Sequence, residues 1–237
     1  MTKPNHMPTA KPAKASDAIA PKCFSLVPAL AQQQMFRTLT ALKLPPAQAT
    51  GAEIAEIAVS FAIGENDPVL LACGGGGARV VRKGLTAARG KDANSDGRLT
   101  AATVCAVTSL LGDAKATVLV CGGRLRVDED YRSAFGFAAR HKLPILYLIS
   151  NSLTPGKRQE LDLRTLYAEF GIPVFSIDAH DAIAAYRVAT EALHNARHGR
   201  GPAVIEALTF GDKEISRELA LDLLRGYMAR HDNRPVL

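Results

Sequence analysis

The sequence predicts an α/β fold in three layers, a parallel sheet flanked by helices. Short apolar runs rich in β-branched residues recur along the chain, and such runs suit strands that are buried on both faces. Segments with helical periodicity separate them, and this alternation gives parallel strands joined by crossover helices. The centres of the five expected strands are Val69, Val118, Ile145, Val174 and Val204.

The stretch 116–152 is the clearest strand-helix-strand unit. Residues 116–121 form an apolar run, residues 131–141 carry apolar side chains at helical spacing, and residues 145–149 form a second apolar run. We therefore expect two parallel strands joined by a helix, with the second strand ending at 150–152. Ligands of parallel sheets bind at the carboxyl ends of the strands, so the segments that follow these two strands are the first candidates for a site.

The other elements follow from periodicity and from Pro and Gly breaks. Further strands are expected at 69–72, 172–177 and 203–208, and further helices at 25–44, 50–63, 78–88, 100–111, 160–170, 182–198 and 213–230. The helix 100–111 is expected to be buried, because apolar side chains cover much of its circumference. Those side chains are Val104, Cys105, Val107 and Leu111.

The length of 237 residues and the apolar content of 47 % suit one domain with a substantial core. We expect this domain to span 23–237. Residues 1–22 are rich in Pro, Ala, Lys and Thr, so a disordered arm is expected there. The arm has no apolar h-region, which argues against a secretory signal, and its lack of arginine makes a transit peptide the weaker alternative. No apolar run is long enough to span a bilayer.

The cysteine spacing and the charge distribution argue against a structural zinc site and against nucleic acid as a partner. The four cysteines lack C-x-x-C spacing, which favours reduced thiols in a cytoplasmic protein over a structural zinc site. The formal net charge is +6, but aromatic residues make up only 5 % of the chain and do not interleave with basic ones. Nucleic acid is therefore not an expected partner. We interpret the charge as solvated, with anionic ligands or an acidic partner as the alternative.

Four consecutive glycines, 74–77, follow the strand expected at 69–72 and precede the helix expected at 78–88. Backbone N–H groups in such a run could cradle a phosphate at the start of the helix. The pattern is neither G-x-G-x-x-G nor a P-loop, and a flexible turn is an equal alternative.

Residues 92–103 are similar to a calcium loop of the EF-hand or dockerin kind. Oxygen-bearing side chains fall at positions one, three and five, and glycine falls at position six. Position twelve, where a bidentate carboxylate belongs, is Thr103. The missing carboxylate favours a surface loop over a calcium site.

Several segments together resemble one known family. They are 121–152, which contains Lys142-Leu143-Pro144 and Asn151-Ser152, and the segments 170–173, 177–181 and 196–207. The chain resembles the alpha subunits of thiamine-diphosphate-dependent 2-oxo acid dehydrogenases, the pyruvate and branched-chain enzymes. The first segment matches their cofactor motif. The resemblance covers roughly 30–231, and it implies the thiamin diphosphate-binding fold.

The resemblance implies thiamine diphosphate and Mg²⁺ as cofactors. Its motif places cofactor binding at Gly122, Gly123, Arg124, Asn151 and Ser152. In the family an Asp and an Asn of the motif bind Mg²⁺, and here Gly123 and Ser152 stand in those places. The metal and diphosphate ligands are therefore expected to be largely lost, and no metal ligand is assigned. Arg124 either neutralises a phosphate in place of the metal or points into solvent.

No catalytic residue is assigned. His180 is expected to be exposed in a turn and His194 to lie on a polar helix face, and neither has a partnered acid at catalytic spacing. In the family a His-Ser loop after the last strand takes part in passing the acyl group to the lipoyl carrier. Here Phe210 is followed almost at once by the last helix, so that loop is absent.

Two functions follow from the resemblance and its departures. The first is an alpha-like E1 component, an oxidoreductase subunit that works with a beta-like E1 subunit in a homo- or hetero-oligomer. The alternative is a non-catalytic structural or regulatory homologue that does not bind thiamine diphosphate. Fold by itself does not decide between them.

Overall fold

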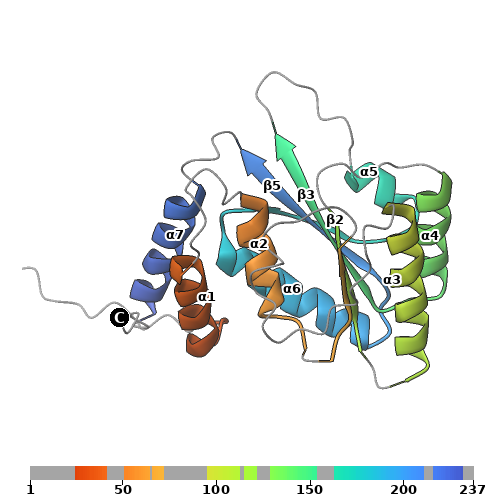
Figure 1. Ribbon diagram of the computed structural model, residues 1–237, viewed down its shortest axis with the longest axis horizontal. Helices are drawn as coiled ribbons and strands as arrows, with labels where there is room; N and C mark the ends of the chain where they lie inside the picture. Colours follow the sequence, from red (N-terminus) through yellow and green to blue (C-terminus); the bar gives the residue numbers. More distant parts are fainter. Residues whose placement is uncertain are drawn as a thin grey trace, which may run out of the picture.

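The computed structural model describes residues 25–41, 51–64, 66–71, 95–112, 115–121, 129–153, 163–210 and 216–231. Its strands are β1 (Val69–Leu71), β2 (Thr117–Cys121), β3 (Ile145–Leu153), β4 (Val174–Asp178) and β5 (Ala203–Phe210). Its helices are α1 (Ala29–Ala41), α2 (Gly51–Ser60), α3 (Ser95–Leu110), α4 (Glu129–Arg140), α5 (Leu163–Ala168), α6 (Ala182–Arg197) and α7 (Ser216–Arg230). Figure 1 shows these elements around one sheet.

The described strands form one parallel sheet in the order β1-β2-β3-β5-β4. The predicted α/β class with a five-stranded parallel sheet is therefore confirmed. The longest pairing joins β3 to β5, from Leu146 beside Ala203 to Leu153 beside Phe210. Because β4 lies beyond β5, the chain leaves β3, passes over the position of β5, and then returns to fill it.

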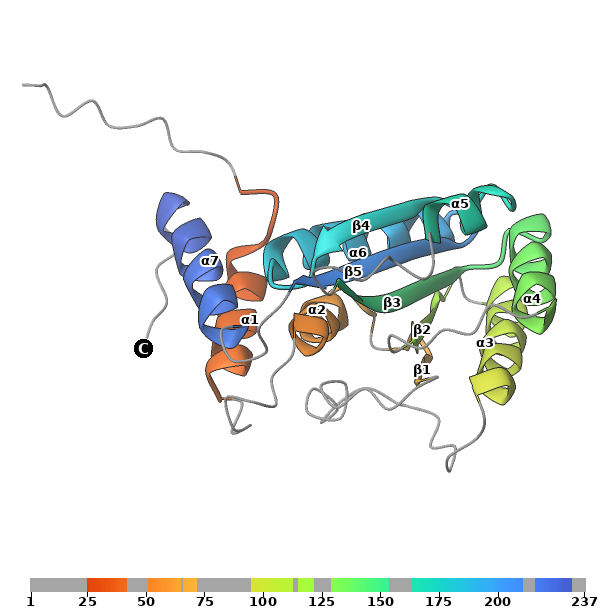
Figure 2. The ribbon, with the colours of Figure 1, turned by 90° about the horizontal axis from the view of Figure 1, so that it is seen from above.

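Helices cover both faces of the sheet, as Figure 2 shows. Helices α2, α6, α7 and α1 pack in one hydrophobic cluster, and α3, α4 and α5 pack in the other. Side chains of each strand alternate between the clusters: Val118 and Val120 of β2 point to the first, while Leu119 and Cys121 point to the second. Apolar residues fill both faces, which explains why the strands read as continuous apolar runs.

Helix α6 shows how the sequence sets an element's bounds. The Asp181 carboxylate accepts a hydrogen bond from the Ala184 backbone N–H at 2.9 Å and caps the first turn. Gly199, with φ of 71°, follows the C-cap and takes the left-handed conformation that ends many helices. Between these points the buried face of α6 is largely alanine, so the helix backbone can approach the sheet closely.

A buried carboxylate anchors the amino-terminal edge of the sheet. Asp67 is 4 % exposed at its side chain and accepts hydrogen bonds from the backbone N–H of Gly64 at 2.8 Å and of Ala116 at 2.9 Å. It also forms an ion pair with Arg197 near the end of α6. Asp67 therefore joins the turn before β1, the start of β2 and the end of α6.

Helix α3 begins five residues earlier than predicted. Residues 95–103 are helical, so the expectation of a loop there, surface or calcium-binding, is wrong from position four of the pattern onward. Leu99, Ala102 and Ala106 are buried at helical spacing, which extends the periodicity upstream of Thr100. The first part of the pattern, 92–94, lies outside the described residues.

The predicted burial of α3 is also wrong in detail. Val104 is 57 % exposed and Leu111 is 83 % exposed, whereas Cys105 and Val107 are half-buried. The helix covers the sheet from one side only, and Leu99 and Ala106 occupy the stripe that faces it. Val104 and Leu111 consequently face outward, while Cys105 and Val107 pack partly buried against the cluster.

Other predictions differ in length or fall outside the structure. Strand β3 ends at Leu153, one residue beyond the predicted end at 150–152, and the helix predicted at 160–170 is described as the short α5. The predicted arm 1–22, the glycine run 74–77 and the helix predicted at 78–88 lie outside the described residues. Within the described ranges, no helix is both long and apolar enough to traverse a bilayer.

Candidate functional site

The sheet has its topological switch point between β3 and β5. The chain leaves the carboxyl end of β3 for α5 on one face, and it leaves the carboxyl end of β5 for α7, which packs in the cluster of the other face. Figure 1 shows the two strand ends side by side. Open parallel sheets bind ligands in the crevice that such a divergence creates, so this edge is the candidate site.

A polar cluster lies at this position. The Glu206 carboxylate on β5 is 3 % exposed and accepts a hydrogen bond at each of its oxygens. Asn151 Nδ2 on β3 donates to Glu206 Oε1 at 2.9 Å, and Ser176 Oγ on β4 donates to Glu206 Oε2 at 2.7 Å. Arg164 Nε on α5 donates to Ser176 Oγ at 3.2 Å. We call these four side chains the Glu206 cluster.

Strand register explains why these side chains meet. Ile149, Glu206 and Ser176 lie opposite one another on β3, β5 and β4. Asn151 is two residues beyond Ile149, so its side chain points to the same face of the sheet. That face is the one that α5 covers, which places Arg164 within reach of Ser176.

An aromatic layer lies deeper on the same face. The ring of Phe135 is 5.1 Å from that of Tyr147 and 4.8 Å from that of Tyr167, centre to centre. Burial raises the pKa of Tyr147 and Tyr167 far above the ordinary phenol value, and the neighbouring Cys121 adds to the effect. Both phenols therefore stay protonated at physiological pH, and they belong to the hydrophobic core beneath this face instead of acting as acid-base groups.

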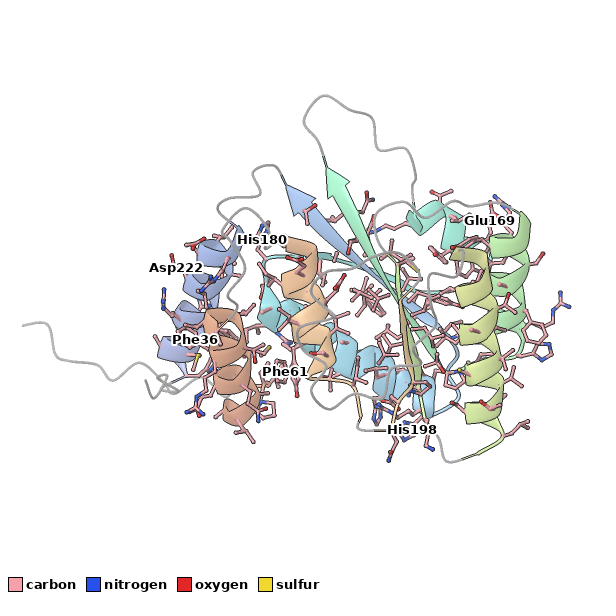
Figure 3. The ribbon with its side chains drawn as sticks, viewed as in Figure 1. Phe36, Phe61, Glu169, His180, His198 and Asp222 are labelled. Atoms are coloured by element: carbon pink, nitrogen blue, oxygen red, sulfur yellow. The ribbon has the colours of Figure 1, made fainter. Side chains whose placement is uncertain are left out.

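His180 corrects the sequence prediction. It is only 6 % exposed, and its Nδ1 lies 2.9 Å from Asp178 Oδ1, which also accepts the His180 backbone N–H at 2.9 Å. The Ala179 N–H donates to the Leu208 carbonyl, which attaches this turn to β5; His180 is labelled in Figure 3. The expectation of an exposed histidine without an acid partner is wrong. His194 is exposed, as expected.

The predicted cofactor positions are described only in part. Gly122, Gly123 and Arg124 lie outside the described residues, directly after the end of β2. Asn151 and Ser152 lie in the last part of β3 and not in a loop, and the Ser152 backbone pairs with Thr209. The assignment of these five residues to cofactor binding remains a prediction.

The described residues alone do not fit a bound Mg²⁺. Mg²⁺ takes several hard oxygen ligands in near-octahedral geometry. In the described part of the chain no group of three or more His, Cys, Asp or Glu side chains could hold a metal ion. Asn151 can offer one amide oxygen, but both oxygens of Glu206 already accept hydrogen bonds. We therefore derive no chemical step through the metal or the cofactor.

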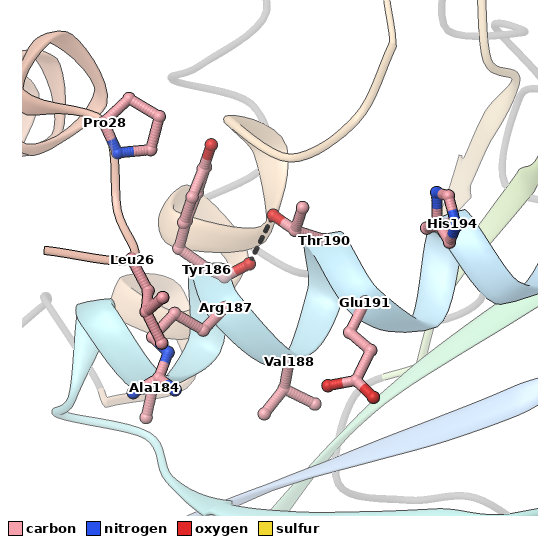
Figure 4. Close-up of a pocket in the computed structure, with 9 residues that line it drawn as sticks. All are labelled: Leu26, Pro28, Ala184, Tyr186, Arg187, Val188, Thr190, Glu191 and His194. Atoms are coloured by element: carbon pink, nitrogen blue, oxygen red, sulfur yellow. Dashed lines mark hydrogen bonds between the residues drawn. The ribbon is translucent and has the colours of Figure 1, made fainter.

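A groove of about 650 Å³ lies elsewhere, between the segment before α1 and the outer side of α6 (Figure 4). Its lining is Leu26, Pro28, Ala184, Tyr186, Arg187, Val188, Thr190, Glu191 and His194. None of these residues belongs to the Glu206 cluster. The groove is therefore separate from the candidate site.

Sequence reasoning missed the centre of the cluster. Glu206 stands in the otherwise apolar run 203–208, and a charged residue in a strand that is buried on both faces requires partners. That conflict was the available signal. Ser176 and Arg164 carry no comparable signal, because their role depends on the register of β4 and on the position of α5.

The fold and the cluster define a class of protein: a parallel α/β domain with its candidate site at the carboxyl ends of the central strands. A family model for the Dehydrogenase E1 component matches residues 93–212, just over half of the 237-residue chain. The chain belongs to the Dehydrogenase E1 component family. This confirms the family resemblance found in the sequence.

Curated relatives match over part of their length. The pyruvate dehydrogenase E1 component subunit alpha of Acholeplasma laidlawii is 30 % identical over 102 residues, which cover 40 % of this chain and 30 % of that protein. The protein of the same name from Rhizobium meliloti is 34 % identical over 84 residues, which cover 32 % of this chain and 24 % of that protein. The chain thus spans less than a third of either relative.

Among solved structures, a protein from Mycobacterium smegmatis that was assigned as a thiamin diphosphate-dependent enzyme is similar over 69 % of this chain and 33 % of that chain. The TM-score is 0.45 and the sequence identity is 17 %.

Proposed function

We propose that the chain is an alpha-like E1 component of a thiamine-diphosphate-dependent 2-oxo acid dehydrogenase, an oxidoreductase subunit. The family match over 93–212 carries this proposal, because that range includes β2 to β5 and thus the whole candidate edge of the sheet. The relatives are named as alpha subunits of pyruvate dehydrogenase E1, which supports a 2-oxo acid as the substrate class. We also propose a cytoplasmic location, because the four cysteines of the sequence lack the spacing of a structural zinc site and suit reduced thiols.

The proposed enzyme needs a second subunit. The relatives carry the name "subunit alpha", which implies at least one other kind of subunit in their enzymes. We infer that a beta-like E1 subunit lies against the carboxyl edge of the sheet and completes the site in a hetero-oligomer. The chain by itself is then expected to be inactive.

We further propose that the metal and diphosphate ligands are largely lost from this chain. Gly123 and Ser152 stand where the family motif has its metal-binding Asp and Asn, and a serine hydroxyl is a poor substitute for a carboxylate. Thiamine diphosphate would then bind weakly, or only in the presence of the partner.

Reconstitution tests the proposal. The chain is mixed with a beta-like E1 subunit from the same genome, and release of CO₂ from pyruvate and branched-chain 2-oxo acids is measured with and without thiamine diphosphate and Mg²⁺. We expect cofactor-dependent decarboxylation that requires both proteins. A complex that forms and shows no such activity with any of these acids contradicts the enzyme proposal.

The second candidate function is a non-catalytic structural or regulatory homologue. The departures at Gly123 and Ser152 and the missing His-Ser loop favour it. In that case the chain forms a stable complex with its partner, and the complex does not respond to thiamine diphosphate. The same reconstitution experiment separates the two candidates, because complex formation and decarboxylation are read independently.

A further inference from the structure

We propose that Glu206 is a positioning residue that fixes the orientation of the Asn151 side-chain amide at the switch point of the sheet. Asn151 is the predicted cofactor-binding residue whose side chain the structure describes. The inference about orientation stands on geometry alone, and only the nature of the ligand rests on the proposed function.

The chemistry of the two groups decides which way the amide faces. An ionised carboxylate only accepts hydrogen bonds, whereas an amide has a donating nitrogen and an accepting oxygen. The 2.9 Å contact with Glu206 Oε1 therefore requires Nδ2 of Asn151 and excludes the flipped amide. Hydrogen bonds to a charged acceptor are also stronger than neutral ones, so the preference is large.

Glu206 is itself held at both oxygens. Ser176 Oγ donates to Oε2 at 2.7 Å while Asn151 Nδ2 donates to Oε1, and the side chain is almost fully buried. A carboxylate bound at each oxygen by a different strand cannot rotate without breaking one of these bonds. Arg164 in turn donates to Ser176, so the restraint extends from α5 to β3.

The consequence is an amide oxygen with a defined direction. With Nδ2 bound to Glu206, Oδ1 of Asn151 points away from the carboxylate, and no other described residue donates a hydrogen bond to it. We infer that this oxygen accepts a hydrogen bond from a ligand at the carboxyl edge. A buried carboxylate in a central strand lowers the free energy of unfolding. We infer that it is retained because it orders the Asn151 amide.

The test reads the amide directly in the full-length chain. In ¹H–¹⁵N spectra the Asn151 Nδ2 pair is assigned by its loss in Asn151→Ala, and the solvent exchange of its protons is measured. In Glu206→Ala this exchange should become about tenfold faster, the loss expected for one charge-assisted hydrogen bond. An unchanged exchange rate in the folded variant overturns the proposal.

Two variants serve as controls. Ser176→Ala removes the other bond to Glu206 without touching the amide, and we expect a much smaller change; an equally large one would mean general loosening of the sheet and overturns the proposal. Glu206→Gln keeps the size and one acceptor oxygen, so exchange should rise only severalfold. If Glu206→Ala does not fold, Glu206→Gln is used for the test. An exchange rate in Glu206→Gln equal to that of the native chain then overturns the proposal.

The second readout uses the reconstituted complex. There, Glu206→Ala should raise the thiamine diphosphate concentration needed for half-maximal decarboxylation about tenfold, as loss of a group that orients a ligand-binding residue does. An unchanged requirement overturns the link between Glu206 and the cofactor. An inactive native complex counts against the proposed function instead, and the exchange measurement on the isolated chain still decides the role of Glu206.

Discussion

Asp67 is a buried charged side chain whose removal should destabilise the fold. Its carboxylate is buried, pairs with Arg197 and accepts the backbone N–H groups of Gly64 and Ala116. Asp67→Ala leaves these donors without their partner, and we expect the free energy of unfolding to fall by about 3 kcal/mol. Urea denaturation measures the change.

Asp222→Ala is the matched control. Asp222 also pairs with an arginine, Arg225, but both side chains are more than half exposed. Its removal should change the free energy of unfolding by less than about 0.5 kcal/mol. Equal losses in the two variants would contradict the role assigned to Asp67.

The buried phenols give a second prediction at this scale. Among the described residues, none forms a hydrogen bond with the hydroxyl of Tyr147 or Tyr167. Tyr147→Phe and Tyr167→Phe should therefore each raise the free energy of unfolding at pH 7 by up to about 1 kcal/mol. Tyr227→Phe is the control, because the Tyr227 hydroxyl lies 3.2 Å from Ser25 Oγ and its loss should destabilise slightly.

The same phenols predict an alkaline limit of stability. Burial raises the pKa of both groups in the folded chain, so as the pH rises past about 10 the unfolded chain loses these protons first. The contribution of the two protonated phenols to the free energy of unfolding is fully present below that pH and declines above it. Urea denaturation at pH 7 and pH 10.5 should show a smaller alkaline loss in both variants. A stability loss at pH 7 would instead indicate that the hydroxyls bind buried water.

Single residues were the part of the site least accessible to sequence reasoning. Asn151 was selected because a motif contains it, but its partner Glu206 is 55 positions away and meets it only through the pairing of β3 with β5. His180 was expected to be exposed because turns usually are, and its burial depends on how Ala179 attaches to Leu208. Long-range register determined both outcomes.

At the scale of elements, strands were predicted well and helix faces less well. Apolar runs located all five described strands, because strands that are buried on both faces leave a continuous signal. Helix α3 carries apolar residues around its circumference, so periodicity alone did not tell which stripe faces the sheet. The structure assigns that stripe to Leu99, Ala102 and Ala106.

This assignment predicts unequal effects of two leucine substitutions on α3 and its end. Leu99→Ala removes a buried side chain and should lower the free energy of unfolding by about 3 kcal/mol. Leu111→Ala, at a position that is mostly exposed, should change it by less than about 0.5 kcal/mol. Urea denaturation of both variants measures the difference. A large loss in Leu111→Ala would mean that another protein surface covers this position.

At the scale of the whole molecule, the range that matches the family model contains the switch point of the sheet. The matched range 93–212 contains the switch point between β3 and β5, and the Glu206 cluster occupies it. The five positions of the cofactor motif end β3 or follow β2, at that same carboxyl edge. We propose that this chain retains the carboxyl edge of the parallel sheet but has largely lost the ligands for the metal and the diphosphate.

Thermal unfolding of the isolated chain tests this claim most directly. The unfolding temperature is measured with millimolar thiamine diphosphate, with and without Mg²⁺. A ligand at a hundred times its dissociation constant stabilises by about 2.7 kcal/mol, which raises the unfolding temperature of a chain of this size by several degrees. We predict no such rise. A clear rise that depends on Mg²⁺ would contradict the loss of the ligands and would show that the isolated chain still binds the cofactor with its metal.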